Sequence, residues 1–331
     1  MFNIIMINPQ LFATEVQTTL LPNLAPEVKT FYDKNLIEEA SAALVHDQFG
    51  QKRPIPKNGG KTIEFRKFAS LPKALTPLTE GVTPDGKNLK VTAITAEVAQ
   101  YGDYVVMSDV LELTAIDPVG VETSTLLGNQ MGLTMDTVTR NELHSGTNVS
   151  YCPKVAADGT ETEVTSRAAL DETCQLTVKM VQKVAAKLKG QNAPKINGKY
   201  VAIIHPYVAY ALMRDPEWVH AHTYGGTTNL FTGEIGEIAG VRFVETTEAK
   251  VYDNGVFGTL FMGANAYGVV DINGGGTEFI YKPKGSAGTA DPLDQRSSAG
   301  WKGMKTAKIL VDNYIVRVES KVADFADTPA N

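Results

Sequence analysis

The sequence predicts an α+β fold organised around one long helix, and three observations lead to this prediction. Residues 117–146 contain no proline beyond Pro118, and at about 1.5 Å per residue such a helix would span roughly 40 Å. Residues 61–68 and 89–109 alternate apolar and polar side chains, as half-exposed strands do. Residues 167–206 combine an amphipathic helical pattern with an apolar strand, which is typical of a compact α/β unit.

The first fifty residues predict little regular structure apart from one helix. Residues 1–30 are interrupted by Pro9, Pro22 and Pro26 and sustain no apolar period. They fit either an arm that docks on another surface or a frayed terminus. Residues 26–45 have a helical pattern, with Pro26 in the first turn, and a polar hinge follows them.

The two alternating segments predict a long β-hairpin. Residues 70–90, which connect them, hold four turn signals, and their polar character offers little local burial. An isolated two-stranded hairpin is marginal in water. We therefore expect this hairpin to rest on a partner surface.

The long helix is expected to begin at Asp117, a good N-cap residue, and to stop at Gly146. One apolar stripe steps along it by four, four and three residues: Leu127, Met131, Met135 and Val138. Asp136 and Arg140 stand one turn apart and could pair on the outside of the helix.

Gly128 and Gly132 also stand one turn apart on this helix. Each glycine costs about 1 kcal/mol relative to alanine in a helix interior. A surface without Cβ atoms would let another backbone approach closely and offset that cost, which makes both glycines candidate contact residues. A long core helix of poor propensity is the alternative interpretation.

The second half of the chain predicts further helices and strands in succession. An amphipathic helix is expected over residues 167–190, and a fully buried strand over 200–206. Residues 225–298 are glycine-rich and hold short strands. The last strong element covers 301–322, where a break in the alternation at Asp312 and Asn313 suggests a β-bulge.

Composition excludes several classes of protein. The 331 residues carry 43% hydrophobic and 21% charged side chains, as an ordinary soluble protein does. A net charge of −6 argues against a surface that grips nucleic acid by neutralising phosphates. Neither a signal peptide nor a membrane-spanning helix is expected. Cys152 and Cys174 fit structural thiols in a reducing compartment.

No motif for catalysis, cofactor binding or metal binding is found. Gly60-Lys61-Thr62 resembles the end of a phosphate-binding loop but lacks the upstream glycine. His220 and His222 are two residues apart, which suits no usual ligand spacing, and His205 is expected to be a core or turn histidine. The sequence therefore predicts no enzyme and no cofactor.

Several long runs, and their order, resemble a known family. The runs include APEVKTFYDKNLIEEA, PLTEGVTPDGKNLKVTAITAEVAQYGDYVVMSD, YVAIIHP and GEIGEIAGVRFVET. They are similar to the major capsid proteins of coliphage N-four-like viruses and related prophages, and the likeness covers roughly residues 20–322. The order of elements resembles the Hong Kong 97-type fold of tailed-bacteriophage capsid proteins.

The resemblance implies a domain organisation and a function. Residues 1–50 would form the N-terminal arm, 51–108 the extended loop, 109–164 the peripheral domain with the spine helix, 165–295 the axial domain, and 296–331 the return strand and tail. It implies a major capsid protein that assembles as pentamers and hexamers into an icosahedral head around double-stranded DNA. Assembly would take place in the bacterial host cytoplasm, with scaffolding, portal and decoration proteins as partners and no membrane.

Relatives of this fold include shells whose subunits cross-link. That chemistry would need a lysine on the extended loop, and Lys73, Lys87 or Lys90 could supply it, although exposed lysines usually serve solvation. Two alternatives to the viral shell remain open from the sequence. One is an encapsulin-type nanocompartment shell protein, and the other is a soluble hydrolase with an unrecognised site.

Overall fold

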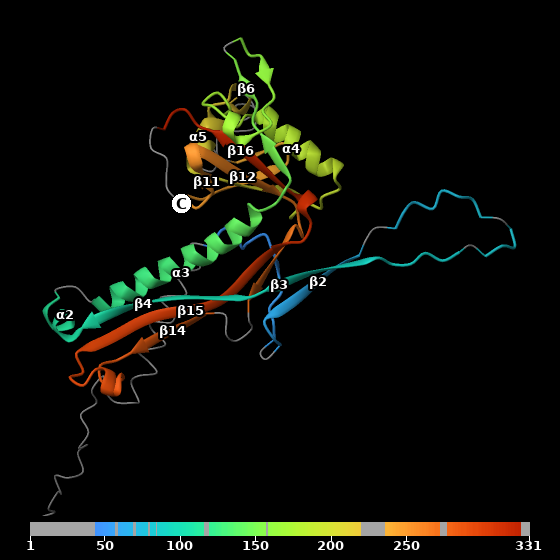
Figure 1. Cartoon of the computed structure of the whole chain (residues 1–331). Coiled ribbons are helices and arrows are strands. Elements are labelled where there is room, and N and C mark those ends of the chain that lie inside the picture. Colours follow the sequence, from blue (N-terminus) through green and yellow to red (C-terminus); the bar gives the residue numbers. More distant parts are fainter. Residues whose placement is uncertain are drawn as a thin grey trace, which may run out of the picture.

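The computed structural model describes residues 44–56, 59–68, 71–78, 80–83, 85–115, 119–156, 158–219, 236–271 and 277–325. Residues 1–43, which hold most of the expected arm over 1–50 and nearly all of the helix expected over 26–45, lie outside these ranges, as do the expected cap at Asp117 and His220 and His222. The described chain forms an elongated lower body, a compact upper unit and a projecting two-stranded ribbon (Figure 1). This arrangement confirms the predicted α+β class.

The lower body is built from α3 (Val119–Leu143) lying along a five-stranded sheet. The short α2 (Asp109–Thr114) precedes it, and the Ser108 hydroxyl caps α2 by accepting from the Leu111 N–H. The predicted apolar stripe is confirmed where it meets the sheet. Its residues Leu127, Met131 and Met135 are buried against Trp301, whereas Val138 is half-buried.

The five-stranded sheet is centred on its longest strand, β15 (Arg296–Ile309). On one side β15 pairs antiparallel with β4 (Ala99–Ser108). On the other side it pairs with β14 (Thr277–Lys282) and β13 (Tyr267–Asp271), and β1 (Gln51–Lys52) runs parallel to β13.

The ribbon consists of β2 (Thr62–Phe68) and β3 (Val91–Glu97), which pair antiparallel from Thr62 opposite Glu97 to Phe68 opposite Val91. It projects from the end of the lower body away from α2 (Figure 1). The long strand expected over 89–109 is divided: β3 pairs with β2, whereas β4 pairs with β15. The predicted hairpin therefore exists, but its second strand continues into the body.

The upper unit surrounds a seven-stranded sheet in the order β5-β16-β12-β8-β10-β9, with β11 paired to β12. The strands are β5 (Val149–Tyr151), β8 (Tyr200–Ile204), β9 (Glu237–Ile238), β10 (Val241–Glu245), β11 (Val251–Tyr252), β12 (Val256–Met262) and β16 (Ile315–Lys321). Two helices, α4 (Val178–Gly190) and α5 (Pro206–Met213), pack on it around the largest apolar cluster. Every residue of β8 is buried, which confirms the predicted core strand.

Smaller elements complete the described chain. A hairpin of β6 (Lys154–Val155) and β7 (Glu161–Thr162) rises above the upper unit (Figure 1). Short 3-10 turns are η2 (Arg167–Ala169), η3 (Asp253–Gly255), η4 (Gly288–Ala290) and η5 (Asp312–Tyr314). Among all the residues that the structure describes, no helix has both the length and the apolar character needed to cross a bilayer.

The helix expected over 167–190 begins later than predicted. Thr177 adopts an extended conformation and its side chain accepts from the Met180 N–H, so α4 starts at Val178. Leu170 and Cys174 are buried as their spacing suggested, but they lie in a non-helical segment that packs under the same core. The spacing of apolar residues therefore predicted burial correctly over this segment, but it predicted a helix that does not form there.

The prediction of a β-bulge at residues 312–313 is wrong, because the chain crosses from one sheet to the other at this position. The 3-10 turn η5 carries the chain from β15 in the lower sheet to β16 in the upper one. Gly146 contributes to this crossing by being small. A Cβ on it would lie 2.7 Å from the Asp312 Oδ1 atom, and α3 has already ended at Leu143.

Candidate assembly surfaces

The tip of the ribbon exposes a row of large apolar side chains. Leu75 and Leu78 on the β2–β3 connection are 82% and 78% exposed. Other large apolar side chains of the ribbon are also exposed: Phe68, Leu71, Val82, Leu89 and Val91. A row of exposed apolar side chains on a narrow ribbon marks an interaction site.

The structure places the five candidate contact residues in two separate regions. Lys73, Lys87 and Lys90 are exposed on the β2–β3 connection, next to the leucines. Gly128 and Gly132 are buried on α3 in the lower body. Burial of both glycines fits the close-approach interpretation better than a solvent-facing position.

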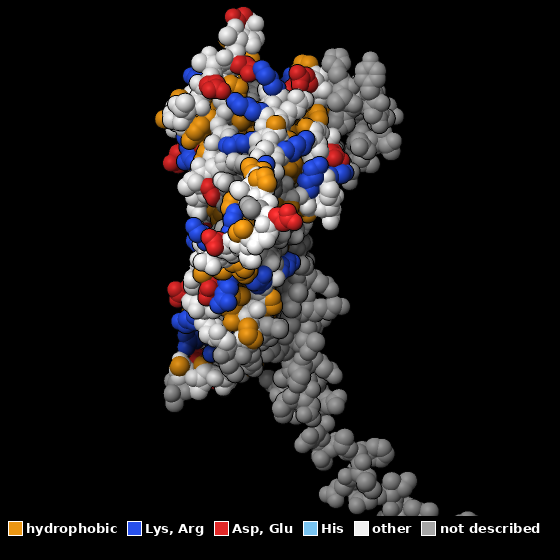
Figure 2. All heavy atoms as spheres, turned by 90° about the vertical axis from the view of Figure 1, so that its right-hand side faces the viewer, with side chains coloured by type: hydrophobic (Ala, Val, Ile, Leu, Met, Phe, Trp, Pro, Cys, Tyr) orange, Lys and Arg blue, Asp and Glu red, His pale blue; other side chains and the backbone are white. Residues whose placement is uncertain are grey.

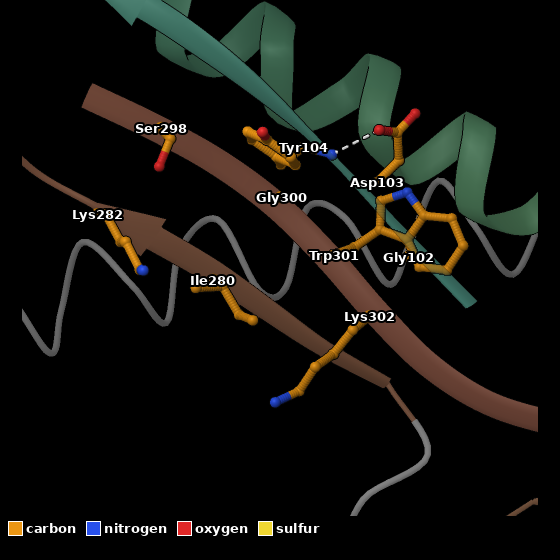
Figure 3. Close-up of a pocket in the computed structure, with 9 residues that line it drawn as sticks. All are labelled: Gly102, Asp103, Tyr104, Ile280, Lys282, Ser298, Gly300, Trp301 and Lys302. Atoms are coloured by element: carbon orange, nitrogen blue, oxygen red, sulfur yellow. Dashed lines mark hydrogen bonds between the residues drawn. The ribbon is translucent and has the colours of Figure 1, made fainter. Parts of the chain in front are cut away.

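A second candidate surface is a hollow of about 620 Å³ on the lower sheet (Figure 3). Along β14 and β15, the side chains of Phe279 and Trp301 pack toward α3. Because strand side chains alternate between faces, their neighbours point to the other face of the sheet. The lining residues include Tyr104, Ile280, Lys282, Ser298, Gly300 and Lys302, and Tyr104 is 69% exposed.

Glycines at the centre of the hollow allow β4 and β15 to approach closely. Gly300 lies opposite Tyr104, and a Cβ on Gly300 would stand 2.6 Å from the Tyr104 Cβ. A Cβ on Gly102 would stand 2.6 Å from the Trp301 carbonyl oxygen. Both distances are shorter than real Cβ contacts, so the two strands could not hold this spacing with larger residues.

Gln130 of α3 supports the hollow from behind. Its amide nitrogen donates to Asp103 Oδ2 at 2.7 Å, and its amide oxygen accepts from the Trp301 indole at 3.1 Å. One helical side chain thereby joins β4 to β15. The hydrogen bonds from Gln130 and from the Tyr104 N–H lower the pKa of Asp103.

Behind these surfaces, α3 buries a line of polar residues at one-turn spacing: Asp136, Arg140 and His144. Asp136 accepts from the backbone N–H groups of Val45 and His46 at 2.9 and 2.7 Å, and lies 2.6 Å from His46 Nδ1. The expectation that Asp136 pairs with Arg140 on the outside of the helix is therefore wrong. We call these three residues the polar stripe.

The rest of the polar stripe faces the upper unit. Arg140 donates to the Glu248 carbonyl at 2.9 Å, and burial lowers the pKa of its guanidinium. His144 Nδ1 lies 2.9 Å from the Tyr252 hydroxyl. Each stripe residue thus reaches a different segment, and together they fix the N-terminal segment and the upper unit to one helix.

A second buried pair holds the same N-terminal segment. Asp47 accepts from Thr139 at 2.6 Å and pairs with Lys305 of β15. The Tyr267 hydroxyl donates to the His46 carbonyl, and burial raises the pKa of Tyr267. Nothing in the sequence pattern predicts these buried contacts, because His46 and Asp47 lie in an irregular segment without periodicity.

Catalytic or metal-binding groupings do not emerge from the described residues. No cluster of three or more His, Cys, Asp or Glu side chains able to hold a metal is found among them. His205 caps α5 by accepting from the Tyr207 N–H at 3.1 Å, as expected for a turn histidine. Cys152 and Cys174 are free and buried, and burial raises the pKa of both thiols, which fits the expected structural thiols.

Charged side chains of both signs are interspersed over the face shown in Figure 2. Exposed charged pairs of the described chain include Lys179 with Glu161 at 2.8 Å and Lys183 with Glu163 at 3.1 Å. Such pairs contribute little to stability. That face presents no extended area of one sign of the kind that grips a nucleic-acid backbone.

The comparisons with known proteins agree with this geometry. Residues 91–317 match the family model described as phage capsid protein. No curated protein matches the chain in sequence. The fold is similar to three solved phage capsids, each at low sequence identity.

The capsid of cyanophage P-SCSP1u is 16% identical, with a TM-score of 0.65 over 85% of this chain and 89% of that chain. The capsid of Ralstonia phage GP4 is 16% identical, with a TM-score of 0.62 over 87% and 90%. The head of Helicobacter pylori bacteriophage KHP40 is 13% identical, with a TM-score of 0.62 over 96% and 98%.

Proposed function

We propose, on the premise that this chain belongs to the phage capsid protein family, that its copies assemble as pentamers and hexamers into an icosahedral head enclosing double-stranded DNA. Its role is that of a major capsid protein with the Hong Kong 97-type fold, and its place is the virion. The family favours this role over a nanocompartment shell or a soluble hydrolase. We assign no catalytic activity and no cofactor to it.

The ribbon is the observation that carries the proposal. Its root is anchored, because Phe65 and Ala96 are buried in a small cluster with Ile55 and Val270. Its tip is not anchored, because Leu75 and Leu78 remain exposed. A neighbouring copy that covers the tip would remove this apolar area from water, at about 25 cal/mol per Å². Contacts of this head-to-tail kind close into rings.

The domain roles follow the chain order. Residues 1–50 act as the arm, 51–108 as the extended loop, and 109–164 as the peripheral domain with α3 as its spine. Residues 165–295 form the axial domain, and 296–331 return to the periphery. Sheet pairing crosses these boundaries, since β13 and β14 join the lower sheet and β16 joins the upper one.

Partners beyond the chain itself include scaffolding, portal and decoration proteins, met during assembly in the host cytoplasm. The hollow above Gly300 and the exposed ribbon are the surfaces offered to them. Lys73, Lys87 and Lys90 are the candidate lysines for any cross-link between subunits, because all three are exposed on the ribbon connection. The net charge of −6 suits a container that encloses DNA without sequence-specific binding.

Sedimentation and negative-stain microscopy test the proposal directly. The chain is expressed with and without its viral assembly partners, and closed particles or capsomers are expected. A stable monomer under all assembly conditions would contradict it. The double variant Leu75→Ser with Leu78→Ser should lower particle yield. Its matched control is Lys179→Ser with Lys183→Ser, on an exposed face of α4, which should leave particle yield unchanged.

A further inference from the structure

The end of α3 is fastened to the upper unit by apolar packing of Leu143 and by hydrogen bonds of Arg140 and His144. His144 is 7% exposed, and its Nδ1 lies 2.9 Å from the Tyr252 hydroxyl of β11. Arg317 of β16 donates to the His144 carbonyl. A Cβ on Gly258 of β12 would lie 2.6 Å from the His144 Cε1 atom, so the ring lies directly against that strand. We call this contact the joint.

The joint holds as many negative as positive groups, and each carboxylate already has a partner. Its cations are Arg140 of α3, Lys250 of the segment before β11, Arg167 of η2 and Arg317 of β16. Its two glutamates are Glu248, before β11, and Glu319 of β16. His46, paired with Asp136, faces it from the N-terminal segment, and Asp253 faces Lys250.

Both glutamates in the joint are already engaged. Glu319 accepts two hydrogen bonds from Arg167, at 2.6 and 2.7 Å, and lies 3.0 Å from the Arg317 Nε. Glu248 lies 3.7 Å from Arg140. The Arg167 guanidinium also stacks 3.5 Å from the centre of the Tyr252 ring. Little negative charge is left to balance a further cation.

The second ring nitrogen of His144, Nε2, has no neighbouring group that would compensate a positive charge. His144 Nε2 is buried and has no hydrogen-bond partner among the described residues. A proton placed on it would have no acceptor and would sit among Arg140, Arg317 and Lys250. Burial, together with His46 and these three cations, lowers the pKa of His144 well below its usual value.

We propose that His144 is a proton-operated catch in the joint between the long helix and the upper unit. While neutral, the ring holds the end of α3 against β11 and β12. On taking up a proton it leaves this site, which loosens the contact of the end of α3 with β11 and β12, while the apolar cluster around Leu143 still joins the two bodies. The inference concerns the single subunit and is independent of the proposed assembly.

The direction of the pH effect follows from the shift. An unfolded or released histidine titrates near pH 6.5, and the held ring titrates lower. The released state therefore binds more protons, so the joint is fully stable above about pH 6.5 and weakens as the pH falls toward the lowered pKa. His205 serves as a comparison, because burial lowers its pKa to about 4 and it caps α5, where its ring packs on Phe257 of β12 and does not contact the end of α3.

Hydrogen exchange of the free, full-length subunit between pH 7.5 and 5 tests the catch, after correction for the intrinsic pH dependence of exchange. The opening constant of amides in residues 140–146 and 251–255 should rise up to about tenfold per pH unit below 6.5. Amides of α4 and β8 should keep their protection. His144→Gln, which cannot take up the proton, should abolish the rise, and His205→Gln should leave it unchanged.

Two results would overturn the catch. One is a rise in His144→Gln equal to that of the wild type, and the other is a loss of α4 and β8 protection at the same pH as the joint. If His144→Gln does not fold, Tyr252→Phe replaces it. Removing the hydroxyl that contacts Nδ1 should move the opening of the joint to higher pH, and an unchanged midpoint would also overturn the proposal.

Discussion

The upper unit and the ribbon show how similar local patterns can have opposite fates. In β12 and β8 every residue is buried, because one face of these strands packs in the core with α4 and α5 and the other packs against Leu143 of α3 and Tyr267 of β13. In β2 only Phe65 is buried. Both regions are strand-forming and rich in apolar side chains. The difference is the surface available to cover them, which the rest of the subunit supplies for the upper unit and which the ribbon must find elsewhere.

The largest difference between the two regions is expected for substitutions in the core of the upper unit. Leu188 of α4 is fully buried. Leu188→Ala should lower the free energy of unfolding of the free subunit by about 2–5 kcal/mol, because it removes apolar contacts and leaves a cavity. Leu75→Ala on the ribbon is the matched control and should change it by no more than about 0.5 kcal/mol. Equal losses in a denaturant titration would show that the ribbon packs on its own chain.

The polar stripe should be almost as sensitive as the core. Asp136→Ala leaves the N–H groups of Val45 and His46 without their acceptor in a buried site. We expect a loss of about 2–4 kcal/mol, because each buried unsatisfied donor costs about 1–3 kcal/mol. Glu142→Ala on the same helix removes a partly exposed pair with Lys308 and should cost less than about 1 kcal/mol. Thermal unfolding of both variants gives the ranking, and a smaller effect for Asp136→Ala would remove the stripe from the fold's essential contacts.

The glycines of α3 should show a smaller effect with an informative sign. If Gly128 and Gly132 meet another backbone, Gly128→Leu or Gly132→Leu should cost about 1–3 kcal/mol or abolish particle formation. If they face solvent, Gly→Ala at either position should stabilise by up to about 1 kcal/mol. Gly190 at the end of α4 is the control, since nothing lies within 4 Å of a Cβ there and Gly190→Ala should stabilise. Raised melting temperatures at all three positions would rule out close approach.

The smallest effect in the free subunit is expected at the ribbon tip, where assembly should reveal it. Amides of residues 71–90 should exchange fast in the free subunit and slowly in the shell, because their protection depends on a neighbouring copy. Amides of β8 should be protected in both forms. Equal exchange of residues 71–90 in the two forms would show that the ribbon gains no cover on assembly.

The sequence by itself determined where most elements lie and which of their sides are apolar. The stripe of Leu127, Met131 and Met135, the buried β8 and the self-insufficient ribbon could all be predicted. These features are local, because a period of 3.6 or 2 reports which side of an element avoids water.

Only the tertiary structure decided what each side meets. Charged residues one turn apart on a helix usually face solvent, so Asp136 and Arg140 gave no sign of burial. Their burial is possible because distant segments bring partners, Val45 and His46 to one and Glu248 to the other. The same reason separates β15 from β16, since strand partners far along the chain, not the strand's own alternation, assign a strand to a sheet.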